Sequence, residues 1–478
     1  MKLGVGRAGF VALAALLLSY GVMTSAARAQ LLPDQQDNGG QSGSSGSQDQ
    51  SSVPSIIVGG GDQSASSDSG SQNNQNVTFD EAMTELANGQ MQQAYDDFNT
   101  VAANGDPRAM FYMGYMLDNG LYGGKNAFSA VSWYEQAARL DYLPAMAAMG
   151  YNYLTGHGVI KSVKEAKKWY TKAARMGSAD AQEALGTMLR DGIGYEKNYE
   201  LATQWFQQAA LQNNARAQAD LGQMYLMGHG VQPSPQHALY WYNYAAKQGD
   251  VYALTALGYM YRSGIGVKKD PALALAYYRA AAEKGHIPAE LALAHMYEYG
   301  EGDKTKGPPD AALWYYKAAK AGSAVAQMRM GYIYENGFGL PQNGAEALKW
   351  YTEAMEKGHY MPALMAVARL NLQGKIVPQN AGRAGVLYQE CAMTGVSLCQ
   401  YELGMLYKTG TGGMPQDMVQ AYKWLALSAQ GLQPGSQAQR DAVVQRISVA
   451  NLMSSDQLTE ARQAVNTWQA EPSTSFNW

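Results

Sequence analysis

The sequence predicts an all-α protein: a right-handed α-solenoid of about nine 36-residue helix-turn-helix repeats, with capping helices at both ends. Two observations predict it. Pairs of mostly aromatic residues recur at steps of 36 or 37 residues, with an alanine three residues before each pair. Between the pairs, an alanine, a glycine, a tyrosine or leucine, and a second glycine recur at fixed spacings. Residues three and four apart share one helix face, so each pattern predicts one helix of a repeat.

The aromatic pairs mark the second helix of each repeat. Because they recur with alanines on the same face, both members of each pair are predicted to lie in the core. The first members of the pairs are Trp133, Trp169, Trp205, Trp241, Tyr277, Trp314, Trp350, Leu387 and Trp424.

The glycine pattern marks the first helix of each repeat. Gly150 represents the glycine that allows a neighbouring helix to approach closely, and Gly156 the one that ends the helix in a left-handed conformation. Residues typical of helix N-termini stand where the pattern predicts that helices begin, as at Asp270, where an N-cap residue precedes a proline. Each repeat is therefore predicted to be a first helix, a glycine loop, a second helix and a tight turn.

These patterns divide the chain into six parts. The period ends after Gly431, and an atypical unit precedes the first full repeat. We expect a signal peptide at 1–29, a disordered tether rich in Ser, Gly, Gln and Asn at 30–77, an N-terminal capping repeat at 78–105, nine repeats at 106–431, C-terminal capping helices at 432–470 and a tail at 471–478.

The N-terminus has the layout of an export signal. Lys2 and Arg7 precede nine apolar residues, and a small-x-small site predicts cleavage between Ala29 and Gln30. The apolar run is too short to span a bilayer, and no later run reaches 18 residues. We therefore expect an exported protein without a membrane span after cleavage, periplasmic or, alternatively, secreted.

Nine repetitions of these two motifs resemble the Sel-one-like repeat (SLR) family, a branch of the tetratricopeptide-like α-solenoids. The resemblance covers about 330 residues. Departures from the pattern are Ala294 and Ala368 in place of the core glycine, and Leu387 in place of the aromatic residue. The resemblance implies an adaptor that holds other proteins. Exported bacterial members are similar to regulators of exopolysaccharide production, scaffolds for polysaccharide export and host-interaction factors.

The chain has two cysteines, Cys391 and Cys399, which the repeat register places across a tight turn. Cysteine-rich exported members of the family have a bridge of similar spacing. In an oxidising compartment we expect a Cys391–Cys399 disulfide. The alternative is a pair of buried thiols in slots for small residues.

No motif in the sequence indicates catalysis. There is no Gly-x-Ser-x-Gly, Ser-x-x-Lys or phosphate-binding loop, and the six histidines lack metal-ligand spacing. We therefore expect no enzyme activity, cofactor or metal. The net charge of −4 gives no basic field for nucleic acid.

The candidate binding residues follow the core glycine of the first helix by one or four positions. The helical wheel predicts that they are exposed, on the helix that lines the concave face of tetratricopeptide-like solenoids. They are Tyr115, Tyr151, Arg190, Gln223, Tyr259, Arg262, His295, Tyr332 and Arg369. Aromatic residues with scattered charges suit an extended peptide or a sugar chain, although an ordinary solvated surface would have the same pattern.

The sequence thus predicts a non-catalytic scaffold or regulator that binds other proteins in the cell envelope. Two alternatives stay open. One is a module or hydrolase that acts on peptidoglycan or exopolysaccharide, and the other is a secreted effector that acts on host proteins.

Overall fold

The computed structural model describes residues 77–471, which form 22 α-helices. The predicted signal peptide with its Ala29–Gln30 cleavage site, the tether apart from Val77 and the tail apart from Glu471 lie outside the described residues. Within them, the prediction of an all-α solenoid of helix-turn-helix repeats is confirmed. The chain forms two compact units, divided within α10 (Ala215–Met227).

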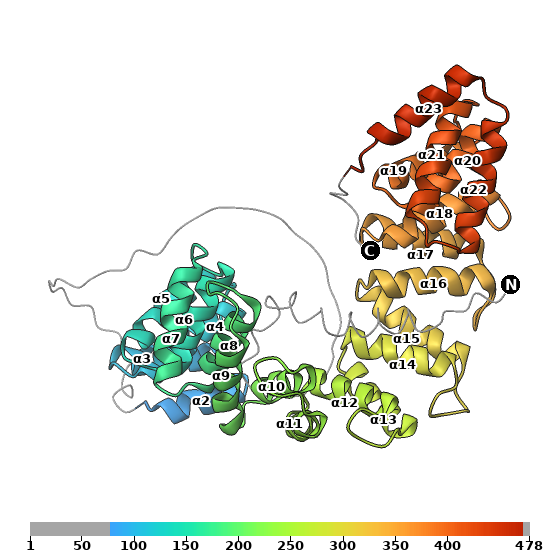
Figure 1. The fold of residues 1–478 in the computed structure, drawn as a ribbon. Coiled ribbons are helices and arrows are strands. Elements are labelled where there is room, and N and C mark those ends of the chain that lie inside the picture. Colours follow the sequence, from blue (N-terminus) through green and yellow to red (C-terminus); the bar gives the residue numbers. More distant parts are fainter. Residues whose placement is uncertain (1–76, 472–478) are drawn as a thin grey trace. The chain divides into compact units, whose positions relative to one another are not determined.

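The first unit comprises residues 77–217 with 229–231. Its helices pack in chain order, each against the next, as Figure 1 shows from blue to green. They are α2 (Phe79–Ala87), α3 (Met91–Ala103), α4 (Pro107–Asn119), α5 (Ala127–Arg139), α6 (Leu143–Thr155), α7 (Val163–Arg175), α8 (Ala179–Asp191) and α9 (Tyr199–Leu211).

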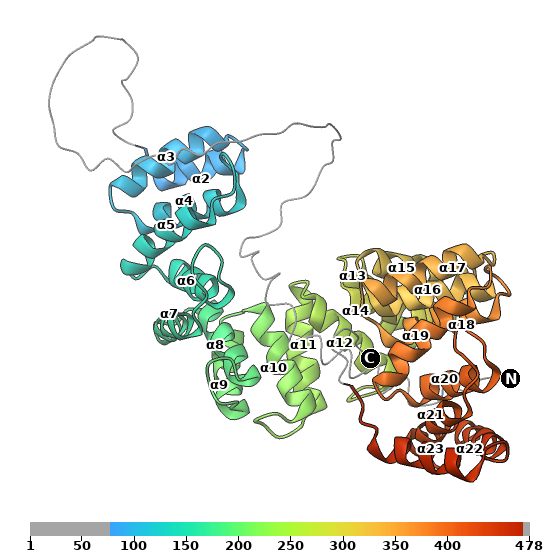
Figure 2. The same cartoon turned by 90° about the horizontal axis from the view of Figure 1, so that it is seen from above.

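The second unit comprises residues 218–228 with 232–471. Its helices pack mainly against their neighbours in the chain, as Figure 2 shows for α13 to α17. Its helices after α10 are α11 (Pro235–Lys247), α12 (Val251–Ser263), α13 (Pro271–Ala282), α14 (Ile287–Glu298), α15 (Pro308–Lys320), α16 (Ala324–Asn336), α17 (Gly344–Glu356), α18 (Met361–Gln373), α19 (Ala381–Met393), α20 (Ser397–Thr409), α21 (Met418–Gly431), α22 (Gln437–Ala450) and α23 (Ser455–Thr467).

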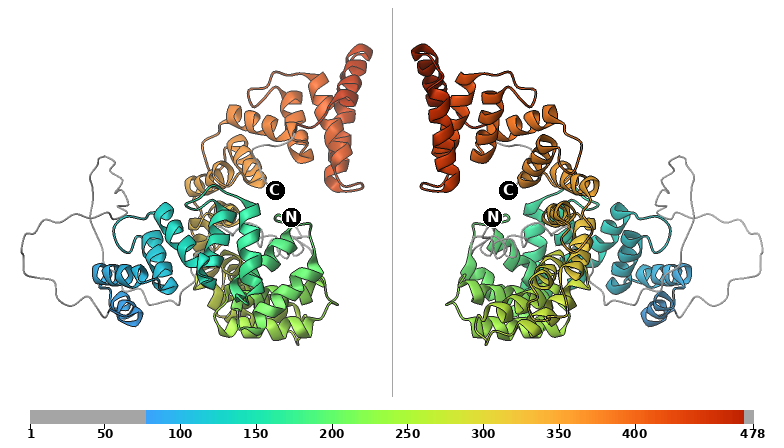
Figure 3. Two further views of the ribbon diagram at one scale, coloured as in Figure 1. Left: turned by 90° about the vertical axis from the view of Figure 1, so that its left-hand side faces the viewer. Right: turned by 90° about the vertical axis from the view of Figure 1, so that its right-hand side faces the viewer.

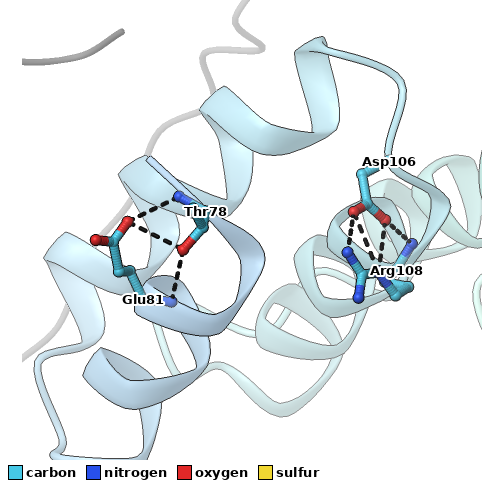
Figure 4. Close-up of polar contacts among 4 residues, drawn as sticks. All are labelled: Thr78, Glu81, Asp106 and Arg108. Atoms are coloured by element: carbon cyan, nitrogen blue, oxygen red, sulfur yellow. Dashed lines mark hydrogen bonds and ion pairs between the residues drawn. The ribbon is translucent and has the colours of Figure 1, made fainter. Parts of the chain in front are cut away.

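Side-chain caps begin many of the helices, among them α13, where Asp270 accepts from the amides of Ala272 and Leu273 as predicted. At α2, the Thr78 hydroxyl accepts from the Glu81 amide, and the Glu81 carboxylate accepts from the Thr78 amide at 2.8 Å (Figure 4). At α4, Asp106 accepts from the Arg108 amide at 2.8 Å and pairs with the Arg108 guanidinium at 2.7 Å. These bonds satisfy amides that have no partner within the helix.

Left-handed glycines end the first helices, as predicted. Gly156, for example, closes α6 with φ 84°. Two residues later, a second left-handed glycine brings the loop against the second helix of the preceding repeat. A Cβ atom on Gly266 would lie 2.6 Å from Cβ of Pro235, at the start of α11. At Gly266 the loop therefore closes over the preceding repeat, and only glycine fits both the conformation and the space there.

The second member of each aromatic pair fills the core. Its ring covers the core glycine of the first helix, so a Cβ atom on Gly258 would lie 2.8 Å from the ring of Tyr278, which is 1 % exposed. The first member is less uniform. Trp350 is buried, but Trp133 and Trp241 are only half-buried. The prediction that both members lie in the core is therefore wrong for several repeats, because the first ring stands at the edge of the helix interface.

The C-terminal part closes with helices α22 and α23, which both pack on α21 (red in Figure 3). The indole rings of Trp424 and Trp468 meet there with centroids 5.9 Å apart. In the eighth and ninth repeats, a disulfide joins Cys391 of α19 to Cys399 of α20, with Cα atoms 5.7 Å apart. Both cysteines are fully buried.

Candidate functional site

The candidate binding residues differ more in exposure than their shared register predicts. Tyr332 is 41 % exposed. Arg262 is only 5 % exposed, so the prediction that it is exposed is wrong. The half-buried members are Tyr115, Tyr151, Arg190, Gln223, Tyr259, His295 and Arg369. We describe the members in α12, α14, α16 and α18 together, because these successive first helices belong to the second unit.

Arg262 is buried because it pairs with a residue from a loop. Its Nε and Nη2 atoms lie 2.7 and 2.9 Å from the two carboxylate oxygens of Glu301, which follows α14. The same Nη2 atom lies 2.8 Å from Nδ1 of His295. Burial and the charge of Arg262 lower the pKa of His295 to about 4. The imidazole is therefore neutral at pH 7 and can accept this hydrogen bond.

One repeat further along, Glu298 of α14 receives two partners. Arg329 of α16 forms an ion pair with its carboxylate, and the Tyr315 hydroxyl donates to it at 3.0 Å. The side chain of Glu298 is only 5 % exposed. The carboxylate thus joins two successive first helices and the second helix between them.

The following repeat has the same arrangement. Glu335 of α16 accepts two hydrogen bonds from Arg369 of α18, at 2.7 and 2.8 Å, and one from the Tyr351 hydroxyl at 2.8 Å. Burial alone would raise the pKa of Glu335, but these bonds and the charge of Arg369 lower it. We call the three pairs Arg262–Glu301, Glu298–Arg329 and Glu335–Arg369 the ion-pair ladder.

Two tyrosines lie exposed beside the ion-pair ladder. Tyr332 is covered on one side by the Arg329 guanidinium, 4.6 Å from its ring centroid. Tyr299, at the end of α14, is 60 % exposed. Partial burial and the Glu298 carboxylate raise the pKa of Tyr299, while Arg329 opposes the rise. Arg329 therefore lies close to both tyrosines, and we call Tyr299, Arg329 and Tyr332 the tyrosine surface.

Sequence reasoning missed Tyr299. It lies outside the two positions from which the candidates were chosen, at the end of the first helix, where Thr155, Ser263 and Asn336 stand in other repeats. The available signal was an aromatic residue at a position that is polar in most other repeats.

The chemistry of this face is that of recognition. Each charge of the ion-pair ladder has an opposite charge within the protein, so the exposed groups are aromatic rings and the outer parts of side chains that are already paired, Glu301, Arg329 and Arg369. Within residues 77–471, no cluster of His, Cys, Asp and Glu could hold a metal ion. None of the helices in this part of the chain combines the length and the apolar character that a membrane span requires.

The paired helices define an α-solenoid of helical-hairpin repeats. The Sel1 repeat model matches more than half of the chain, so the protein belongs to the Sel1 repeat family, whose scaffolds typically serve protein–protein interaction and are generally non-catalytic. The nine matched segments are 107–142, 143–178, 179–214, 215–250, 251–286, 287–323, 324–359, 362–393 and 397–431.

Solved bacterial structures resemble this chain. A protective antigen of uropathogenic Escherichia coli that displays an SLR fold is 26 % identical, with 78 % of this chain and 94 % of that chain covered and a TM-score of 0.47. A Sel1 repeat protein from Oxalobacter formigenes is 33 % identical over 52 % of this chain and 100 % of that chain, with a TM-score of 0.49. A search of curated proteins finds no match.

Proposed function

We propose that this protein is a non-catalytic scaffold of the bacterial cell envelope, and that the tyrosine surface binds an extended segment of a partner protein. The observation that supports the binding site is the exposure of Tyr299 and Tyr332 beside charges that are already paired. Tyrosine provides a large contact area with little loss of side-chain freedom and is enriched among the residues that dominate binding energies.

The ion-pair ladder gives this proposal its physical basis. Because Glu298 holds Arg329, and Arg329 covers one side of Tyr332, the ring is ordered before a partner arrives. An ordered side chain loses less entropy on binding. The paired charges add no net field, so we expect a partner segment with apolar or aromatic side chains rather than a strongly charged one.

The binding site is tested by pull-down from envelope extract with the full chain and two variants. We expect Tyr332→Ala to lose a partner that the natural protein retains. Tyr240→Ala is the matched control, because Tyr240 is 51 % exposed on the second helix α11, outside the tyrosine surface. Equal recovery with both variants would refute the site. Binding of the natural protein to a glycan array, lost in Tyr332→Ala, would instead show that the tyrosine surface binds carbohydrate.

The envelope location rests on the predicted N-terminal export signal. Cell fractionation with an antibody tests it, and N-terminal sequencing of the recovered protein tests cleavage after Ala29. We expect the mature chain to begin at Gln30 and to be found in the periplasm. Recovery from the cytosol with Met1 intact would contradict this location, and recovery from culture medium would favour the secreted alternative.

A further inference from the structure

A buried glutamate occupies a position that holds glutamine in four other repeats. The position directly follows the inward-facing small residue of a first helix, an alanine or, in the ninth repeat, Cys399, and we call it the amide slot. Gln182, Gln218, Gln327 and Gln400 occupy it and are 4, 2, 4 and 2 % exposed. Glu290 of α14 stands at the same position and is 5 % exposed. Five side chains of nearly equal size are therefore buried at one register position.

Three glutamines of the amide slot, Gln182, Gln327 and Gln400, make the same hydrogen bond. Each Nε2 atom donates to the carbonyl oxygen of an alanine eight residues earlier, near the end of the preceding repeat's second helix. The distances are 3.1 Å from Gln182 to Ala174, 3.2 Å from Gln327 to Ala319 and 3.4 Å from Gln400 to Ala392. This bond joins one repeat to the next.

The backbone offers Glu290 the same acceptor. Eight residues earlier lies Ala282, whose carbonyl accepts from the Gly285 amide at 2.9 Å. In the glutamine repeats the corresponding turn bonds from Gly177, Gly322 and Gly395 measure 3.1, 3.0 and 3.1 Å. Because the turns match, the Ala282 carbonyl corresponds to the alanine carbonyls that accept from the glutamines of the amide slot.

A carboxylate cannot supply that donor, whereas a protonated carboxyl group can. The Oε2 atom of Glu290 is buried and has no hydrogen-bond partner in the structure. A buried carboxylate without compensation is costly, and two facing acceptors add repulsion. Protonation of Glu290 would remove both the cost of the buried charge and the repulsion between acceptors.

None of the charged neighbours strongly stabilises the carboxylate form of Glu290. On α15, Lys317 acts on Glu290, but its ammonium lies 3.9 Å from the ring centroid of Trp314, and Lys317 is exposed. On α13, Arg279 donates to the Tyr297 hydroxyl at 2.7 Å, and Glu283, which follows α13, is exposed. Burial raises the pKa of Glu290, and Lys317 only partly opposes it.

We propose that Glu290 is protonated in the folded protein and donates to the Ala282 carbonyl, which makes the joint between the fifth and sixth repeats sensitive to pH. The raised pKa fixes the sign. The stabilisation is complete below the ordinary glutamate value of 4.5 and is lost as the pH rises through the raised value of the folded state. The contact between the fifth and sixth repeats is therefore most stable in acid.

Reciprocal substitutions test this proposal in the full chain. Glu290→Gln installs the amide of the other slots, so its bond does not depend on pH. Gln327→Glu places an acid in an existing slot and serves as the matched control. We expect Glu290→Gln to raise Tm by roughly 2–4 °C at pH 8, about the effect of one hydrogen bond in a domain of 150–250 residues, and by less at pH 4. Gln327→Glu should lower Tm at pH 8 and recover part of it at pH 4.

The protonated carboxyl group has its own spectroscopic signature. We expect its carbonyl stretch in the infrared spectrum of the natural protein just above pH 4.5, and its disappearance in Glu290→Gln. Two results would overturn the proposal: no such difference band, or a Glu290→Gln variant whose Tm falls equally at both pH values. Hydrogen exchange gives a further test. After correction for the intrinsic exchange rate, stronger protection of the amides in the α13–α14 turn in acid than at higher pH would support the proposal.

Discussion

The guanidinium of Arg369 donates to both carboxylate oxygens of Glu335, at 2.7 and 2.8 Å, across 34 residues of sequence. Such two-point pairs combine charge with a fixed orientation. This pair ties α16 to α18, two first helices of successive repeats. Glu335 follows Tyr332, the tyrosine that we propose as a contact for the partner, by three residues on α16.

Neutralising Glu335 should weaken this tie. We expect Glu335→Gln to lower the free energy of unfolding of its unit by about 1–2 kcal/mol, since bonds to a charged group are lost while Arg369 remains partly exposed. Because the folded-state pKa of Glu335 is lowered, the stabilisation exists above the ordinary value of 4.5 and disappears as the pH falls through the lower folded value. Urea unfolding at pH 7 and pH 3 measures both effects. Glu353→Gln, which breaks an exposed pair of 3.8 Å, is the control and should change little.

A methyl group on the core glycine of α12 should not be accommodated. We expect Gly258→Ala to cost about 1–3 kcal/mol, because its Cβ would lie 2.8 Å from the Tyr278 ring. Gly382→Ala in α19 is the control. Its Cβ would meet only Asn380 Oδ1 at 3.9 Å, so stability should stay equal or rise through helix propensity. Thermal unfolding followed by circular dichroism compares them, and equal losses would contradict the packing argument.

The Cys391–Cys399 bridge should stabilise the eighth and ninth repeats by about 2–3 kcal/mol on the loop-entropy estimate for a short loop. Replacing both cysteines by alanine matches the residues Ala318 and Ala326 of an earlier turn, so the packing changes little. The natural protein should lose stability when a reductant is added, and the double variant should not respond. Free thiols found by mass spectrometry in protein from the envelope would reject the bridge.

His295 should remain neutral throughout the physiological range. Its folded-state pKa of about 4 lies below the ordinary value of 6.5, so its stabilising contribution is present above pH 6.5 and is lost as the pH falls toward 4. Its ring resonances in heteronuclear NMR should therefore not shift between pH 5.5 and 8. The assignment comes from the signal that is absent in His295→Gln. Titration near pH 6.5 would contradict the described contact with Arg262.

Periodicity predicted the helices well because their ends depend on local chemistry. Gly156 ends α6 through its own backbone conformation, and Asp270 begins α13 through bonds to amides two and three residues away. The binding face was predicted less well. A helical wheel places Arg262 outward, but its exposure depends on Glu301, 39 residues further along and outside any helix. The pattern within one helix cannot reveal a contact that the loop of the next repeat makes.

The glycine loops also imply an order of assembly. The loop that contains Gly266 lies against Pro235, so the start of one repeat's second helix is covered by residues that follow it in the chain. During synthesis, each repeat therefore stays partly open until about 30 more residues have emerged. The most recently made repeat is always the least complete one, and a nascent chain that stalls exposes its unfinished end to chaperones or proteases.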